Sequence, residues 1–167
     1  MKKLLISLLT IALLFTMVAC GGEGNNDGLV SGSGETFGEN VVIEARITMS
    51  ENKDADPLTI VTKLAERKMF AEMSLMPVEF DPQFAPGLDT TTLAGYDKAA
   101  LLSPMIGVIP FVTYVFQVSE GTDANAFAEQ LKSVSNPNWN ICTSADETLT
   151  FVEGNTVIFL MSPASMD

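Results

Sequence analysis

The chain has 167 residues, enough for one domain of ordinary size, and its 21 acidic residues outnumber its 9 basic residues. The resulting net charge of −12 at pH 7 opposes contact with phosphates, so we do not expect nucleic acid as a partner. The chain contains no histidine, which excludes Ser-His-Asp and Cys-His nucleophile activation and the helical zinc motif with two histidines.

The N-terminal 19 residues are typical of a bacterial secretory signal. Lys2 and Lys3 are followed by an uncharged run from Leu4 to Val18, and the small residue Ala19 comes next. The run has about 15 residues, whereas a membrane-spanning helix needs roughly 20. The alternatives are an ordinary cleaved signal followed by an incidental cysteine and an uncleaved N-terminal anchor.

The stretch Val18-Ala19-Cys20 resembles the lipobox of bacterial lipoproteins, although Met17 stands where leucine is usual. The resemblance implies that the thiol of Cys20 receives a diacylglycerol and that the signal is cut immediately before this cysteine. Two acyl chains hold a protein stably at a membrane. We therefore predict a signal peptide at 1–19 and lipidation of Cys20, which anchors the chain to the extracytoplasmic face of the cell membrane.

The segment after Cys20 has the composition of a flexible tether. Residues 21–40 contain seven glycines, two serines and three asparagines. We predict that the lipidated cysteine and tether cover 20–40 and that a single domain covers 41–167. After cleavage the net charge is about −14, which favours solubility, with attraction of cations or basic partners as the alternative.

Cys142 is the remaining thiol once Cys20 carries lipid, so an intramolecular disulfide cannot form. Its neighbours Trp139 and Ile141 are apolar, which favours burial of the thiol. The alternative is a disulfide between two chains.

Hydrophobic periodicity predicts the elements of the domain. Alternation from Val41 to Met49 indicates a half-buried strand. Asp56 followed by Pro57 is typical of a helix start. Gly154-Asn155 is a two-residue hairpin signal. The predicted elements, in chain order, are a strand at 41–49, a helix at 57–68, an extended segment at 69–80, strands at 98–105 and 111–118, a helix at 124–134, and a hairpin at 148–162.

Strands and helices do not alternate one for one in this order, which favours an α+β fold over a parallel doubly wound sheet. We expect a single domain in which an antiparallel sheet of about 5–6 strands carries two helices packed on one face. The strand at 111–118 is apolar on both sides, so we expect it to be central and covered.

The motifs of common enzymes are absent from the sequence. No phosphate-binding G-x-x-x-x-G-K-[ST] loop is present, and a single free cysteine cannot build a thiolate zinc site. The acidic stretch that holds Glu51, Asp54 and Asp56 lacks the glycine and the closing glutamate of a calcium loop, so we interpret it as a solvated loop with a helix cap. We predict no catalytic residue, no cofactor and no metal ligand.

Two uncharged stretches are candidates for interaction. Residues 103–111 are almost wholly apolar although they join two strands, and such connections usually lie on the surface. Exposure of Met105, Ile106, Val108 and Ile109 would make a contact site for a partner or membrane. The alternative is a strand end tucked under a helix. Trp139 would recognise a partner if exposed and would be structural if buried.

From about Gly87 to Met161 the chain resembles a family of small lipoproteins of Gram-positive bacteria that carry a domain of unknown function. The resemblance rests on "GLD", "YVFQV", "AFAEQLK", "WNICTSADE" and "GNTVIFLMS". It implies the compartment, the anchor and a compact α+β domain, and it implies no activity.

We therefore expect a membrane-anchored extracytoplasmic lipoprotein with a binding or interaction role and no catalysis. Its expected partners are the membrane, through the lipid on Cys20, and an unknown protein or cell-wall component. The alternatives are a carboxylate-dependent hydrolase of cell-wall glycan, which needs only two suitably spaced acids, and an accessory solute-binding protein. The solute receptors of transporters usually have two lobes, and this chain has one.

Overall fold

The computed structural model describes residues 34–166, so the predicted signal peptide, Cys20 and the tether up to residue 33 lie outside the described residues. Within this range the chain forms a single α+β domain, which confirms the predicted fold class. Its elements are α1 (Phe37–Glu51), α2 (Pro57–Ala65), a 3-10 helix (Lys68–Phe70), β1 (Leu75–Glu79), β2 (Tyr96–Pro104), β3 (Val112–Val118), α3 (Ala124–Ser133), β4 (Glu147–Glu153) and β5 (Thr156–Ser162).

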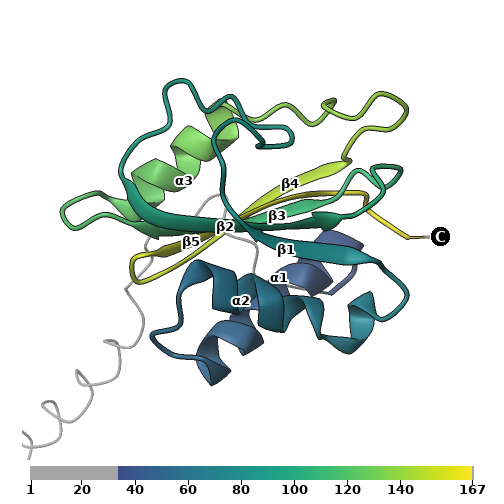
Figure 1. The fold of residues 1–167 in the computed structure, drawn as a ribbon, viewed down its shortest axis with the longest axis horizontal. Coiled ribbons are helices and arrows are strands. Elements are labelled where there is room, and N and C mark those ends of the chain that lie inside the picture. Colours follow the sequence, from purple (N-terminus) through teal and green to yellow (C-terminus); the bar gives the residue numbers. More distant parts are fainter. Residues whose placement is uncertain (1–33, 167) are drawn as a thin grey trace, which may run out of the picture.

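The described strands form one antiparallel sheet with the order β1-β2-β3-β5-β4. The pairing brings the starts of β1, β3 and β4 to the same end of the sheet as the ends of β2 and β5. This end lies on the right of Figure 1, where the connection between β2 and β3 and the connection between α3 and β4 meet.

Both faces of the sheet are covered, which splits the core into two layers (Figure 1). Helices α1 and α2 pack on one face, and α3 packs on the other with the connections that precede β2 and β4. Successive residues of a strand point to opposite faces. Val115 accordingly joins the layer under α1 and α2, whereas Tyr114 and Phe116 join the layer under α3. The central position predicted for β3 is confirmed.

The strand predicted at 41–49 is wrong, because these residues lie inside α1. The side chains that α1 buries recur at helical spacing, and the residues are Gly38, Val41, Val42, Ala45, Thr48 and Met49. Thr36 and Glu39 form a capping box at the N-terminus, which satisfies backbone N–H groups that the helix leaves unpaired. The folded domain therefore starts before residue 41, the start that was predicted for it.

The two predicted helices are present, but they lie on opposite faces of the sheet. Helices α1 and α2 share one face of the sheet. The prediction put the helices at 57–68 and 124–134 on one face. Asp56 and Asp123 cap α2 and α3 with their carboxylates, and Pro57 is at the first turn as expected. The hairpin of β4 and β5 turns at Gly154, which has a φ of 61°.

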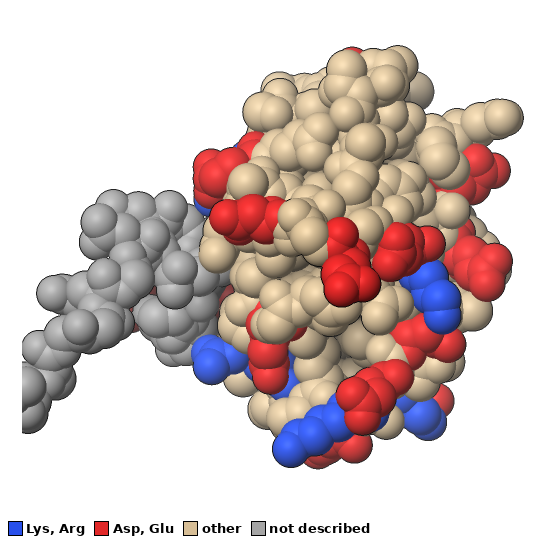
Figure 2. All heavy atoms as spheres, turned by 90° about the vertical axis from the view of Figure 1, so that its left-hand side faces the viewer, with Lys and Arg blue, Asp and Glu red and all other residues tan. Residues whose placement is uncertain are grey.

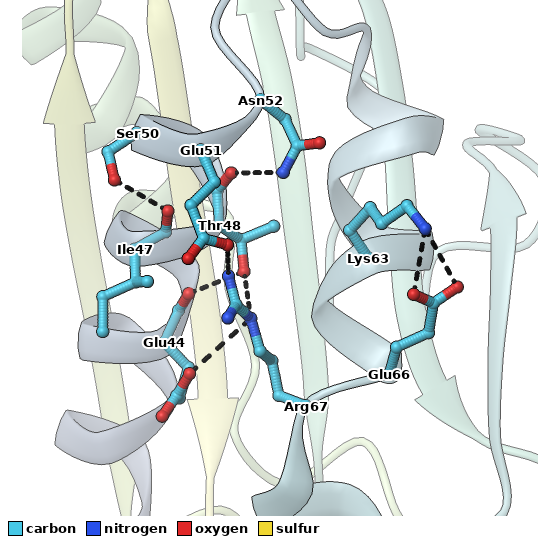
Figure 3. Close-up of polar contacts among 9 residues, drawn as sticks. All are labelled: Glu44, Ile47, Thr48, Ser50, Glu51, Asn52, Lys63, Glu66 and Arg67. Carbon is cyan, nitrogen blue, oxygen red and sulfur yellow. Dashed lines mark hydrogen bonds and ion pairs between the residues drawn. The ribbon is translucent and has the colours of Figure 1, made fainter.

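Arg67, just after α2, links α1 to α2 (Figure 3). Its Nε donates to the hydroxyl of the buried Thr48 at 2.9 Å, and its guanidinium pairs with Glu51 at 2.5 Å and with Glu44 at 3.7 Å. This contact joins the two helices that pack on the same face of the sheet. Lys63 and Glu66 form a separate and more exposed pair on the outer side of α2.

Candidate functional site

Exposed apolar side chains gather at the end of the sheet where the β2–β3 and α3–β4 connections meet. Met105, Ile106 and Val108 belong to the connection between β2 and β3 and expose 66–69 % of their surface. Ile141, in the connection before β4, is 99 % exposed, and Phe84, in the connection before β2, is 56 % exposed. We refer to the surface formed by these five residues as the apolar end.

The two connections that carry most of the apolar end are bonded to each other. The side-chain amide of Asn140 donates to the carbonyl of Gly107 at 2.8 Å, and the hydroxyl of Thr143 donates to the carbonyl of Val108 at 3.5 Å. The backbone N–H of Met105 donates to the carbonyl of Ser74 at 2.8 Å. The exposed apolar side chains are thus displayed on a braced surface.

A groove with a cavity volume of about 360 Å³ lies between these connections. Its lining is apolar and aromatic with a few neutral polar groups, and no lining residue is charged. The residues are Met76, Phe84, Pro86, Ser103, Pro104, Met105, Gly107, Ile109, Phe111, Trp139, Asn140 and Ile141. Pockets of this size with mostly apolar walls are common binding sites for ligands and for parts of other macromolecules.

Trp139 is half-buried and belongs both to the groove and to the layer under α3. Its indole packs against Gly87, where the backbone has a φ of +74° and a Cβ atom would lie 3.0 Å from the ring and 2.5 Å from Met161. The contact with Gly87 therefore holds the indole ring in place. A role for Trp139 in interaction stays a prediction.

The sequence prediction placed four residues of the β2–β3 connection at an interaction surface, and the structure separates them. Met105, Ile106 and Val108 are exposed, whereas Ile109 is half-buried and packs against the layer under α1 and α2. Ile109 still lines the groove from its inner side. Phe84 and Ile141 were missed, because neither stands in an apolar run that would have singled it out.

The burial predicted for Cys142 is wrong, because the residue is exposed. Its apolar neighbour Ile141 favoured burial in the sequence, but this side chain is itself exposed to solvent. The segment around Cys142 has no helix or strand to turn alternate side chains inward. The thiol is consequently accessible next to the apolar end.

A second cavity, of about 380 Å³, lies at the opposite end of the sheet, where β1 ends and β2 begins. Its charged lining residues are Asp56, Glu79, Asp97 and Lys98. Figure 2 looks onto this end and shows carboxylates spread across its middle, while the basic side chains lie lower, on the side of α1 and α2. Acidic residues are therefore abundant at the end that faces away from the apolar end.

Two of the three acidic groups of this second cavity, Asp56 and Asp97, have structural partners. Asp56 caps α2, and hydrogen bonds from the backbone and side chain of Thr59 hold its pKa below the usual value. Asp97 accepts a hydrogen bond from the hydroxyl of Ser119 at 2.5 Å. A general acid of a glycosidase needs a raised pKa, which is the opposite of the shift at Asp56. Among residues 34–166, no group of three or more His, Cys, Asp or Glu side chains is placed to hold a metal ion.

Comparison of this chain with protein-family models, with curated proteins and with solved structures gives no match. In the part of the chain that the structure describes, no helix has both the length and the apolar character to cross a membrane.

Proposed function

We propose that this protein is a membrane-anchored extracytoplasmic lipoprotein whose domain binds a partner through the apolar end and catalyses no reaction. The observation that supports the binding role is the grouping of Phe84, Met105, Ile106, Val108 and Ile141 on braced connections around an uncharged groove. A cluster of this kind is stabilised when it leaves water, so it favours a bound state. The lipobox-like stretch at Val18-Ala19-Cys20 supports the anchor.

The anchor is tested by a Cys20→Ser variant expressed in a Gram-positive host, with Cys142→Ser as the matched control. We expect the wild type and Cys142→Ser to take up radiolabelled fatty acid and to sediment with membranes. Cys20→Ser should take up no label and should not reach the mature size at the membrane. A Cys20→Ser protein that stays membrane-bound at the wild-type size would contradict lipidation at this residue.

The binding role is tested by placing a photo-crosslinking amino acid at position 106 in intact membranes. Position 47 on α1 provides the control, since Ile47 is also an exposed isoleucine but lies on the outer face of the helix pair. We expect adducts from position 106 and few or none from position 47. Equal yields at both positions would show that the apolar end has no special affinity.

The absence of catalysis is tested by incubating the purified full chain with cell-wall polymer. We expect no release of soluble glycan fragments, because two of the three acidic groups of the second cavity, Asp56 and Asp97, act as a helix cap and a hydrogen-bond acceptor. Release that is lost in an Asp97→Asn variant would contradict the proposal and would support the hydrolase.

A further inference from the structure

The described chain enters the domain beside the apolar end. Phe37, the first residue of α1, packs its ring against Phe111, which closes the connection between β2 and β3, with ring centroids 5.6 Å apart. The N–H of Phe37 donates to the carbonyl of Ala164 at 2.8 Å, and the hydroxyl of Thr36 donates to Glu147 at the start of β4. The point at which residue 34 joins the domain is therefore at the end that carries the exposed apolar side chains.

The distance along the chain from this point to Cys20 is short. Gly34 follows Cys20 by 14 positions in the sequence. A chain of this length spans at most about 50 Å even when fully extended. If Cys20 carries lipid, as proposed above, the apolar end can reach the leaflet that holds this lipid. The short chain between them keeps the effective concentration of the apolar end at the leaflet high.

The chemistry of the apolar end suits a lipid surface. The segments 103–111 and 136–145 contain no charged residue, so their tips can leave water without burying a charge. Ile106, Val108 and Ile141 are largely exposed, so their insertion among lipid chains would remove much apolar surface from water. The acidic side chains near this end include Glu35 and Glu39, where the described chain enters the domain, and Asp146 and Glu147, where β4 begins.

The charge of the rest of the molecule favours an orientation in which the apolar end faces the membrane. The chain that follows the predicted cleavage site has a net charge of about −14, and the opposite end of the domain displays many carboxylates (Figure 2). Anionic headgroups repel such a surface. The uncharged apolar end is the part of the domain that can approach a bilayer without this repulsion.

We propose that the apolar end docks onto the leaflet that holds the lipid of Cys20, with Ile106, Val108 and Ile141 inserted among the lipid chains. The inference rests on the proposed function and names the partner of the same surface. Docking of this kind holds the domain end-on at the membrane, with the groove at the lipid interface and the second cavity facing away. It requires no anionic lipid, because none of the five residues of the apolar end is basic.

The test uses Trp139, the single tryptophan of the chain, as a reporter at the groove. The full-chain protein is purified from membranes in detergent and reconstituted into vesicles of phosphatidylcholine or of its chain-brominated form, whose bromines quench tryptophan. We expect about a twofold loss of emission in brominated vesicles, because docking brings the indole to the lipid interface. A combined Ile106→Ser and Val108→Ser variant should lose the quenching, whereas Ile47→Ser on α1 should keep it.

Each other outcome has a distinct meaning. Protein that floats with the vesicles but shows no quenching would overturn the docking and leave the anchor standing. Protein that does not float with the vesicles would overturn the proposed anchor itself. Quenching that appears only with phosphatidylglycerol vesicles would overturn the docking proposal, because it would require a basic surface.

The exposed thiol of Cys142 provides a second measurement, one that does not depend on any variant. We expect a membrane-impermeant maleimide to label Cys142 several times more slowly in vesicles than in detergent, because the adjacent Ile141 is inserted. Slow labelling without quenching of Trp139 would show that a second copy or another protein covers the apolar end, and it would overturn the lipid assignment.

Discussion

Thr113, in the central strand β3, buries a hydroxyl for which the described residues provide no hydrogen-bond partner. Thr48 in α1 is equally buried, but its hydroxyl donates to the carbonyl of Glu44 at 2.7 Å and accepts from Arg67. Burying an unpaired polar group has a free-energy cost that a methyl group of the same shape avoids. The two threonines therefore allow a comparison between a buried hydroxyl without a partner among the described residues and a buried hydroxyl with partners.

We predict that Thr113→Val raises the free energy of unfolding by about 1 kcal/mol and that Thr48→Val lowers it by a similar amount. Urea unfolding followed by circular dichroism measures both. If Thr113→Val destabilises the domain as much as Thr48→Val does, the hydroxyl of Thr113 has a partner in solution.

Tyr114 connects the centre of the sheet to the segment before β2, since its hydroxyl donates to the carbonyl of Pro86 at 2.7 Å. Burial raises the pKa of this hydroxyl above its usual value of 10.0. In the unfolded chain the group ionises near pH 10, so unfolding releases a proton at higher pH. Stability that is present below pH 10 is therefore lost as the pH rises above it.

We predict that the wild type loses about 1.4 kcal/mol more stability than Tyr114→Phe between pH 8 and pH 11. At pH 8 the variant should be less stable by about 1 kcal/mol, because the hydrogen bond to Pro86 is lost. Tyr96, whose pKa is also raised by burial, is present in both proteins and contributes equally. Urea titrations at the two pH values measure the difference, and equal losses would contradict the burial of an un-ionised Tyr114.

At the scale of elements, Arg67 is the main polar link between α1 and α2 (Figure 3). Its side chain is 23 % exposed and bonds to groups of α1, whereas Lys63 is 48 % exposed and pairs with Glu66 only three residues away. Exposed pairs within one helix contribute little to stability, because water screens them. We predict a loss of about 1–2 kcal/mol for Arg67→Ala and of at most about 0.5 kcal/mol for Lys63→Ala.

Thermal unfolding monitored at 222 nm compares these two variants under the same conditions. A loss for Lys63→Ala that equals the loss for Arg67→Ala would show that the link between the helices adds nothing beyond a surface pair. Raising the salt concentration should weaken the effect of Lys63 more than that of Arg67, since the more buried pair is screened less.

Local signals explain which elements were predictable from the sequence. Asp56 with Pro57 identified α2, because capping side chains act within a few residues, and hydrophobic periodicity identified α3. The strand predicted at 41–49 failed because the sequence alternates with a period of two, while burial in the structure follows a helical period. The capping box of Thr36 and Glu39 was the signal that favoured a helix.

The apolar end was predictable only in part. A long uncharged connection between two strands identified Met105, Ile106 and Val108, because such segments usually lie at the surface. The inward turn of Ile109 and the exposure of Phe84 and Ile141 depend on how three connections pack together. That packing is long-range and leaves no periodic trace in the sequence.

At the scale of the whole molecule, we propose an acidic domain that a short segment holds near a bilayer, with its uncharged end toward the lipid. The two ends of the domain differ in chemistry. The described chain begins beside Phe111 at the end that carries the exposed apolar side chains, and carboxylates gather at the far end. Both the anchoring and the docking depend on the attachment of lipid at Cys20.

The most direct test is therefore the intact mass of the protein extracted from membranes with detergent. We predict a mature chain that begins at Cys20 and carries a diacylglyceryl group on its sulfur, with Cys142 as its unmodified thiol. A mass that corresponds to a chain beginning at Met1, or to a cleaved chain with an unmodified Cys20, would contradict the proposed lipid anchor.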